Sequence, residues 1–309
     1  MVSKTSLKGF FILLCGVFPL GYSTAQDLDP RAYIRVPVKT TTAFLGYAGS
    51  RGGVVSDPTV IIQNIEATIH TTSVGASHSF DLFGMTSQIL VVLPYSWANV
   101  SGDVGQQSQS VNRSGMADMR ARISVLVFGA PAANLAEVKA APRSTLVGVS
   151  LNLIAPTGQF FSDKLINLGT NRWSFRPEIA ISQPISKRWL FDFYSGVWVF
   201  TNNISFFPGN LTRTQNPMGA FQAHLSYNIG PIFWIAIDGT YYVGGESSIN
   251  NQINDDRVEN TRLGITAVIP TGKTSSLKVA VSTGVQVRIG KDFNTLSVGW
   301  QKTWLYKEK

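Results

Sequence analysis

The feature that most constrains the fold of this chain is an alternation of apolar and polar side chains that recurs along most of the sequence. A clear instance runs from Trp173 to Ser182, where aromatic and aliphatic residues alternate with polar ones such as Arg176 and Glu178. A period of two places successive side chains on opposite faces of a strand. Apolar residues on one face and charges on the other, over roughly ten residues, are typical of a strand with lipid on one side and water on the other.

Twelve segments carry this pattern, and an even number suits a barrel whose two termini lie on the same side of a membrane. They span residues 40–49, 64–76, 86–97, 116–128, 145–155, 172–182, 188–201, 217–228, 232–243, 262–269, 277–288 and 296–304. The sequence therefore predicts an all-β chain that folds as a transmembrane antiparallel β-barrel of about twelve strands.

The connections between these segments alternate in length, as they do in such barrels, where short turns are periplasmic and long loops are extracellular. Residues 129–143 are an exception, because this Ala-rich stretch must return on the short-turn side, where a brief helix would fit. A secreted, soluble β-sandwich is the alternative for the whole scheme. The predicted short turns are residues 183–187, 229–231 and 270–275, and the predicted long loops are residues 49–63, 99–114, 157–171, 202–216 and 244–256.

The N-terminus predicts export. Lys4 and Lys8 precede an apolar stretch, and small residues up to Ala25 offer a cleavage site before Gln26. We therefore expect a signal peptide over residues 1–25 and a barrel over residues 26–309. The single cysteine of the chain, Cys15, lies in the predicted signal, so the exported chain would hold no disulfide and no thiolate metal site.

Composition agrees with this class. Charged residues make up 14% of the chain, whereas an average soluble domain carries roughly 25%. Beyond the N-terminus, no run of roughly 18 apolar residues suggests a transmembrane helix. The modest excess of Lys and Arg is spread along the chain, and together with export it argues against a nucleic-acid partner.

Several short motifs, taken together in order, resemble the transporter family of bacterial outer membranes named for the MetA pathway of phenol degradation. The motifs occupy residues 29–33 (DPRAY), 80–84 (FDLFG), 92–95 (VLPY), 114–118 (SGMAD), 129–131 (GAP), 163–175 (DKLINLGTNRWSF) and 282–284 (STG). The resemblance covers nearly all of residues 26–309. It implies an outer-membrane barrel that takes up aromatic or other hydrophobic compounds. One departure is the charged end Lys307-Glu308-Lys309, where such barrels usually end on an aromatic residue.

Alternation also predicts which side chains line the lumen. Lys and Arg outnumber Asp and Glu among them, which would favour anionic or polarisable solutes, although the same charges could pair and fill a closed interior. Inward aromatic residues favour a route for apolar or aromatic solutes over a wide aqueous pore. The predicted solute pathway consists of Arg120, Arg122, Arg172, Arg176, Glu178, Arg188, Asp192, Tyr194, Trp198, Trp234, Asp238, Arg262 and Arg288, and Glu66, His70, Tyr242 and Lys278 are assigned to the same face.

The predicted loop 157–171 is unusually apolar for an extracellular loop, since it contains Phe160, Phe161, Leu165 and Ile166. These residues could capture solutes at the mouth and fold inward as a constriction, or they could pack against the barrel rim and each other. Residues 204–207 hold further apolar side chains in a second loop.

An enzyme is a further alternative because His224 and Ser226 share one strand face, a spacing that resembles the outer-membrane phospholipase family. Their predicted face is the lumen rather than lipid, so we expect no catalysis, and the sequence indicates no cofactor or metal. The favoured function is passive uptake of small hydrophobic or aromatic compounds across the bacterial outer membrane. A closed structural or surface-binding barrel is the alternative, with a lipid hydrolase more remote. Expected partners are outer-membrane lipids, lipopolysaccharide, the barrel-assembly machinery and the solute.

Overall fold

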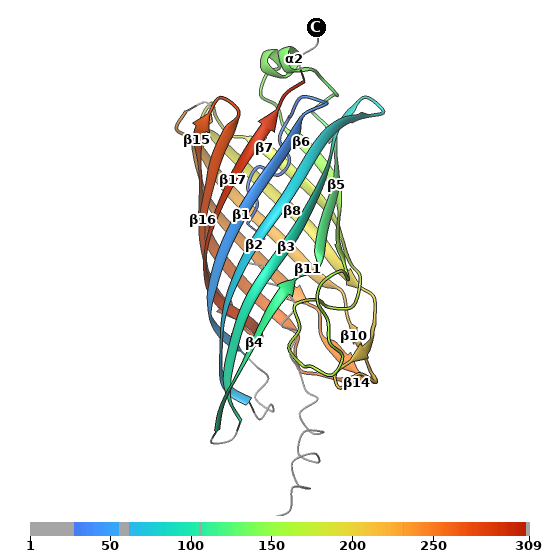
Figure 1. The fold of residues 1–309 in the computed structure, drawn as a ribbon. Coiled ribbons are helices and arrows are strands. Elements are labelled where there is room, and N and C mark those ends of the chain that lie inside the picture. Colours follow the sequence, from blue (N-terminus) through green and yellow to red (C-terminus); the bar gives the residue numbers. More distant parts are fainter. Residues whose placement is uncertain (1–27, 56–61, 105–106, 231, 307–309) are drawn as a thin grey trace, which may run out of the picture.

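A computed structural model describes residues 28–55, 62–104, 107–230 and 232–306. Within these residues, thirteen strands form one antiparallel sheet that closes on itself through the pairing of β1 with β17 (Figure 1). Its members are β1 (Thr41–Val55), β2 (Ile62–Leu82), β3 (Met85–Val104), β4 (Gln107–Met116), β5 (Met119–Phe128), β6 (Leu146–Ala155), β7 (Ser174–Pro184), β8 (Trp189–Phe200), β11 (Met218–Asn228), β12 (Trp234–Gly244), β15 (Val258–Gly272), β16 (Ser275–Val287) and β17 (Gly290–Trp304).

Strands β4 and β5 together make one wall position, because both pair with β3 and only two residues separate them. The interruption lies opposite Pro94 of β3, which has no N–H to donate to the ladder. Ala117 still donates its N–H to the Pro94 carbonyl at 2.9 Å. The described residues therefore form a closed barrel of twelve strands, and the predicted fold class is confirmed.

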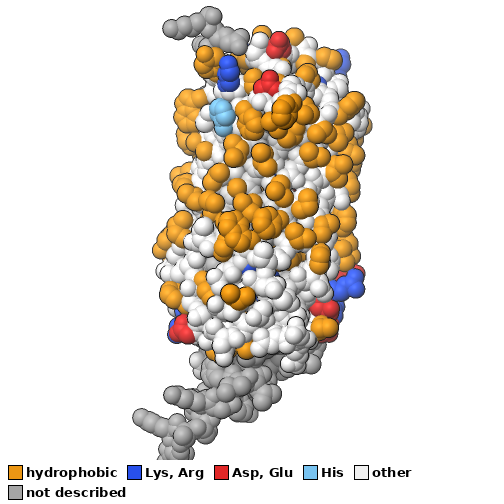
Figure 2. Space-filling model, turned by 90° about the vertical axis from the view of Figure 1, so that its right-hand side faces the viewer, with side chains coloured by type: hydrophobic (Ala, Val, Ile, Leu, Met, Phe, Trp, Pro, Cys, Tyr) orange, Lys and Arg blue, Asp and Glu red, His pale blue; other side chains and the backbone are white. Residues whose placement is uncertain are grey.

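The alternation of the sequence becomes the alternation of inner and outer faces. On β12, Ile237 is 64% exposed on the outer face whereas the next residue, Asp238, is 1% exposed inside. Figure 2 shows hydrophobic side chains over most of the visible wall, with charged residues gathered towards its two ends. A lipid-facing surface requires such a belt. In the described part of the chain, no helix is long and apolar enough to cross a membrane.

One end of the barrel, the short-turn rim, carries the connections at residues 83–84, 185–188, 229–233 and 273–274. The predicted brief helix is found there as α2 (Leu135–Ala140), which begins at a capping box formed by Asn134 and Glu137. The opposite end is the long-loop rim, where the structure contains more strand than the sequence predicted. The described residues of the predicted loops 49–63 and 99–114 are largely strand, because β1, β2 and β3 extend past the apolar belt and β3 pairs with β4.

The predicted loops 202–216 and 244–256 form a second, four-stranded sheet at the long-loop rim. It contains β9 (Asn203–Phe206), β10 (Leu211–Gln215), β13 (Ser247–Ile249) and β14 (Gln252–Ile253). The sequence predicted long polar loops here because these strands are short and bury only scattered side chains, such as Phe206 and Ile249, so they show no sustained alternation. The predicted signal peptide and the charged C-terminal residues lie outside the described residues.

A charge on the outer face should cost most at mid-height. Leu151 lies near the middle of β6 and is exposed on the outer face, whereas Ile269 lies close to the short-turn rim on β15. We expect Leu151→Arg to lower the free energy of unfolding by about 2–4 kcal/mol and Ile269→Arg by about 1 kcal/mol or less, because the cost depends on depth in the bilayer. Urea unfolding in lipid vesicles measures both, and equal losses would contradict a lipid-facing belt.

Candidate functional site: the barrel lumen

The lumen is occupied by a part of the chain that precedes the first strand, here called the N-terminal segment (residues 28–40). It is anchored at the short-turn rim, where the Lys39 N–H donates to the Ser79 carbonyl at 2.8 Å and the Val38 N–H donates to the Ala133 carbonyl at 2.9 Å. The Arg35 guanidinium donates to the Gly129 carbonyl and to Ser144 Oγ. From this anchor the segment runs into the barrel.

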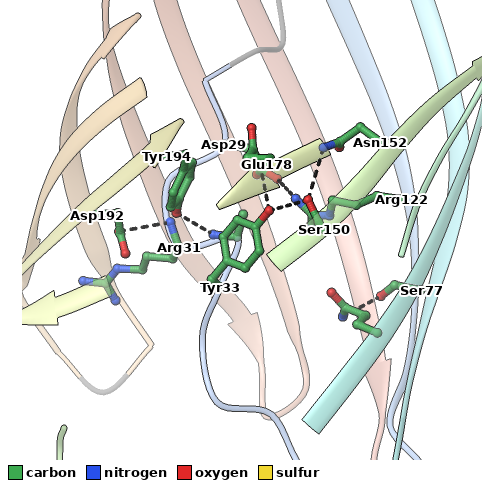
Figure 3. Close-up of polar contacts among 12 residues, drawn as sticks. Asp29, Arg31, Tyr33, Ser77, Arg122, Ser150, Asn152, Glu178, Asp192 and Tyr194 are labelled. Carbon is green, nitrogen blue, oxygen red and sulfur yellow. Dashed lines mark hydrogen bonds and ion pairs between the residues drawn. The ribbon is translucent and has the colours of Figure 1, made fainter. Parts of the chain in front are cut away.

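Deeper in the lumen, Tyr33 joins the segment to the wall (Figure 3). Its hydroxyl donates to Glu178 Oε1 at 2.7 Å and lies 2.6 Å from Ser150 Oγ. Its ring packs edge-on against Tyr194, with ring centroids 5.0 Å apart. The Tyr194 hydroxyl in turn accepts the Ala32 N–H at 3.1 Å. Tyr33 and Tyr194 are almost fully buried, so this end of the lumen is packed like a protein core.

The two residues on either side of Pro30 carry charges that meet opposite charges or π faces on the wall. Asp29 accepts from Lys278 Nζ at 2.9 Å on β16 and lies 3.5 Å from Arg122 on β5. The guanidinium of Arg31 stacks 4.4 Å from the centre of the Trp234 ring. Strands β5 and β16 are not neighbours in the sheet, so Asp29 connects separate parts of the wall across the lumen.

Two glycines of the inner face make room for the segment. A Cβ at Gly148 would lie 2.5 Å from the Tyr33 ring, and a Cβ at Gly264 would lie 2.3 Å from Leu28 Cδ1. Glycine in a strand commonly marks a close approach by another part of the chain. Such inward-facing glycines are the signal in the sequence for a segment inside the lumen, which alternation alone does not predict.

The half of the lumen towards the long-loop rim is lined by arginines that stack on aromatic rings. Arg176 lies 4.9 Å from the centre of the Trp198 ring, and Arg172 lies 4.4 Å from that of Phe200. Arg176 Nε also lies 3.2 Å from Glu178 Oε2. Cation–π contacts of this kind hold a guanidinium against an apolar surface. We call the apolar side chains beside them the aromatic cluster: Ile154, Trp198, Phe200, Met218, Ala220, Tyr242 and Val258.

A second apolar surface lies inside the same rim and is covered by the predicted mouth loop. Leu168 is buried against side chains of β2, β3 and β17, and Ile166 packs on the same cluster. Phe160 and Leu165 are half-buried, whereas Phe161 is 44% exposed. Ile166 and Leu168 therefore pack against the barrel wall, as the second reading of the loop has it, whereas Phe161 is exposed at the mouth.

This loop is held by one buried carboxylate. Asp118 accepts hydrogen bonds from the Gly158 N–H at 2.8 Å, the Thr170 N–H at 2.9 Å and the Thr170 hydroxyl at 2.6 Å. It is 1% exposed. At the exposed tip of the loop, a hydrogen bond from Lys164 lowers the pKa of Asp163. Hydrogen bonds to a buried charge are among the stronger ones in proteins, so Asp118 fixes where the loop lies.

His224 is bonded in a way that does not form a catalytic pair with Ser226. Its Nδ1 lies 2.7 Å from Asp238 Oδ1, and Asp238 Oδ2 accepts from the Thr266 hydroxyl at 2.6 Å. Ser226 Oγ is fully buried and has no hydrogen-bond partner within the described part of the chain. A serine nucleophile needs a base within hydrogen-bond reach. Among the residues described, no group of three or more His, Cys, Asp or Glu side chains could hold a metal ion.

Most side chains assigned to the lumen by alternation lie on the inner face. They are Arg120, Arg122, Arg172, Arg176, Glu178, Asp192, Tyr194, Trp198, Trp234, Asp238, Tyr242, Arg262 and Lys278.

Four assignments to the lumen were wrong. Arg188 lies in the turn before β8, where it donates to Tyr227, and Arg288 lies in the turn after β16, where it pairs with Asp255 at 2.6 Å. Both are exposed, because alternation cannot be extended past the end of a strand. Glu66 and His70 lie on the outer face of β2, whose inner face carries Ile65, Ala67 and Ile69 instead.

Gly148→Val should displace the N-terminal segment, because the added side chain would overlap the Tyr33 ring. If Cys15 is removed with the signal peptide, a cysteine introduced as Ala32→Cys is the only thiol of the exported chain. We expect maleimide to label this thiol at least about tenfold faster in the Gly148→Val background. A free energy of segment displacement that is lower by about 1.4 kcal/mol makes the displaced, accessible state tenfold more populated. Gly239→Val, which faces outward, is the control. Unchanged labelling would show that Tyr33 does not pack on Gly148.

Asp118→Ala should release the mouth loop, because three donors lose their acceptor. We expect trypsin to cleave after Lys164 faster than in the wild type, with local stability reduced by about 1–3 kcal/mol. Asp255→Ala removes an exposed carboxylate from a different loop and should leave cleavage after Lys164 nearly unchanged. Equal cleavage of both variants would contradict the role of Asp118.

Comparison with known proteins gives a consistent picture. A family model described as "Putative MetA-pathway of phenol degradation" matches residues 50–302. No curated protein sequence matches the chain.

Among solved structures, the COG4313 outer membrane channel from Pseudomonas putida F1 is similar in fold, with a TM-score of 0.77 and 22% identity over 90% of this chain and 100% of that chain. The transport unit of the autotransporter AIDA-I from Escherichia coli has a TM-score of 0.53 at 7% identity, over 92% of this chain and 94% of that chain.

Proposed function

Since the chain belongs to the MetA-pathway of phenol degradation family, we propose that it is an outer-membrane channel for passive uptake of small hydrophobic or aromatic compounds. The short-turn rim would face the periplasm and the long-loop rim the exterior, after cleavage of the signal peptide. The outer belt would contact outer-membrane lipids and lipopolysaccharide, with insertion by the barrel-assembly machinery. Uptake of this kind needs neither ATP nor a cofactor.

The observation that carries this proposal is the aromatic cluster inside the lumen. A channel for hydrophilic solutes needs a polar lining that replaces water around the solute. Here Trp198 and Tyr242 are 8% exposed each and pack together with aliphatic side chains. Such a surface binds an aromatic or apolar body, and the neighbouring Arg176 holds its guanidinium against the Trp198 ring.

Entry would begin at the mouth loop. Phe161 is exposed at the long-loop rim, and Ile166 packs on the apolar surface just inside the same rim. These residues offer apolar contacts from the exterior inward. Loops held on a rigid scaffold are common positions for capture sites.

The N-terminal segment limits passage through the other half of the lumen. Tyr33 and Asp29 bind wall strands on more than one side, so the solute route is narrow or closed while these contacts persist. Uptake therefore requires the N-terminal segment to move away from these contacts. The same contacts favour the second candidate, a closed barrel with a structural or surface-binding role.

Solute flux into vesicles distinguishes the two. We expect vesicles with lipopolysaccharide and the purified chain to admit labelled toluene and phenol faster than protein-free vesicles, and to admit arabinose at the protein-free rate. Trp198→Ala should lower aromatic flux by about three- to tenfold through lost ring contacts. Trp300→Ala, on the outer face, is the matched control. Equal aromatic flux with and without protein would favour the closed barrel.

A further inference from the structure

Two buried polar side chains on the lumen wall have atoms without hydrogen-bond partners. Gln222 on β11 and Thr240 on β12 lie directly opposite each other in the ladder between these strands. They are 4% and 3% exposed, and neither Gln222 Oε1 nor Thr240 Oγ1 has a hydrogen-bond partner among the residues that the structure describes. A buried polar atom without a partner costs about 1–3 kcal/mol, so a ligand that paired with both atoms would remove this cost.

The adjacent pair on the same two strands, His224 and Asp238, shows how polar side chains on this wall form hydrogen bonds. Asp238 accepts from both His224 and Thr266, which join β11, β12 and β15. Further along β11 towards the short-turn rim, His224 Nε2 and Ser226 Oγ also lack hydrogen-bond partners in residues 28–55, 62–104, 107–230 and 232–306. Gln222 and Thr240 are therefore the members closest to the long-loop rim in a row of polar side chains along β11 and β12.

On the side towards the long-loop rim, this row gives way to apolar residues. Ala220 precedes Gln222 by two residues on β11 and Tyr242 follows Thr240 by two residues on β12, so both lie on the same inner face. Ala220 and Tyr242 belong to the aromatic cluster, together with Trp198 on β8. A molecule entering from the long-loop rim thus meets an apolar surface first and the Gln222–Thr240 pair next.

We propose that this junction is a binding subsite for a neutral solute with an apolar body and one hydroxyl group, such as a phenol or a small alcohol. This inference rests on the proposed function and names its solute class. The apolar body packs on Trp198 and Tyr242, the hydroxyl donates to Gln222 Oε1, and its oxygen accepts from the Thr240 hydroxyl. The acceptor Gln222 Oε1 then has a donor, and the donor Thr240 hydroxyl has an acceptor.

The chemistry of the pair discriminates between solutes of similar size. An alkane or toluene leaves both wall atoms unpartnered. A carboxylate has no hydrogen to donate to Gln222 Oε1 at neutral pH, and the neighbouring row places Asp192 and Asp238 on the same wall. Sites built to bind a hydroxyl reject the analogue that lacks it, because their polar groups are left unpaired.

The test measures binding to the full-length chain in lipid nanodiscs by equilibrium dialysis, with protein-free nanodiscs as background. The probes are labelled phenol, toluene and benzoate. The variants are Gln222→Met and Thr240→Val, which keep side-chain size and remove the polar atom. Thr71→Val is the matched control, since Thr71 lies on the inner face of β2, where it bonds to Ser96 at 2.8 Å.

We expect the wild type to bind phenol about three- to tenfold more tightly than toluene or benzoate, as one or two neutral hydrogen bonds would give. Each variant should lose most of this preference while keeping its affinity for toluene, and Thr71→Val should keep the preference.

Equal binding of phenol and toluene by the wild type would overturn the subsite whatever the variants do, as would an undiminished preference in both variants. Either result leaves the proposed function intact if aromatic solutes still cross vesicles. Absence of aromatic flux would instead overturn the proposed function.

Discussion

Closure of the sheet by the ladder between β1 and β17 is the constraint on which the rest of the structure depends. The ladder runs from the Thr41–Trp304 pair to the Val55–Gly290 pair without a gap. In lipid, each backbone N–H and C=O must find a partner within the protein, so a sheet that spans a membrane cannot keep open edges. Closure also creates an enclosed interior, and what fills it decides what the barrel can do.

The interior is filled differently in its two halves. Near the short-turn rim, the N-terminal segment supplies Tyr33 to the wall and places Asp29 between Lys278 and Arg122. Near the long-loop rim, guanidinium groups lie on aromatic rings beside an apolar cluster. One half therefore resembles a protein core and the other a binding surface, which is why we assign gating to the first and solute recognition to the second.

The sequence predicted the barrel because lipid on one side and the lumen on the other impose a period of two. The same rule placed Arg176, Asp192 and Trp198 inside. It failed where this physical cause is absent, as in the short strands β9 and β10 at the long-loop rim and at Arg288, beyond a strand end. It also could not reveal the N-terminal segment, because residues 28–40 have no lipid-facing side and their contacts are long-range.

The account's central claim is that the aromatic cluster of the lumen holds the solute. Crystals of the full-length chain soaked in 4-bromophenol test it most directly, because anomalous scattering locates the bromine. We predict a bromine peak inside the barrel against Trp198 and Tyr242, with the hydroxyl directed towards Gln222 and Thr240. A peak confined to the outer apolar belt, or none inside the barrel, would contradict the claim.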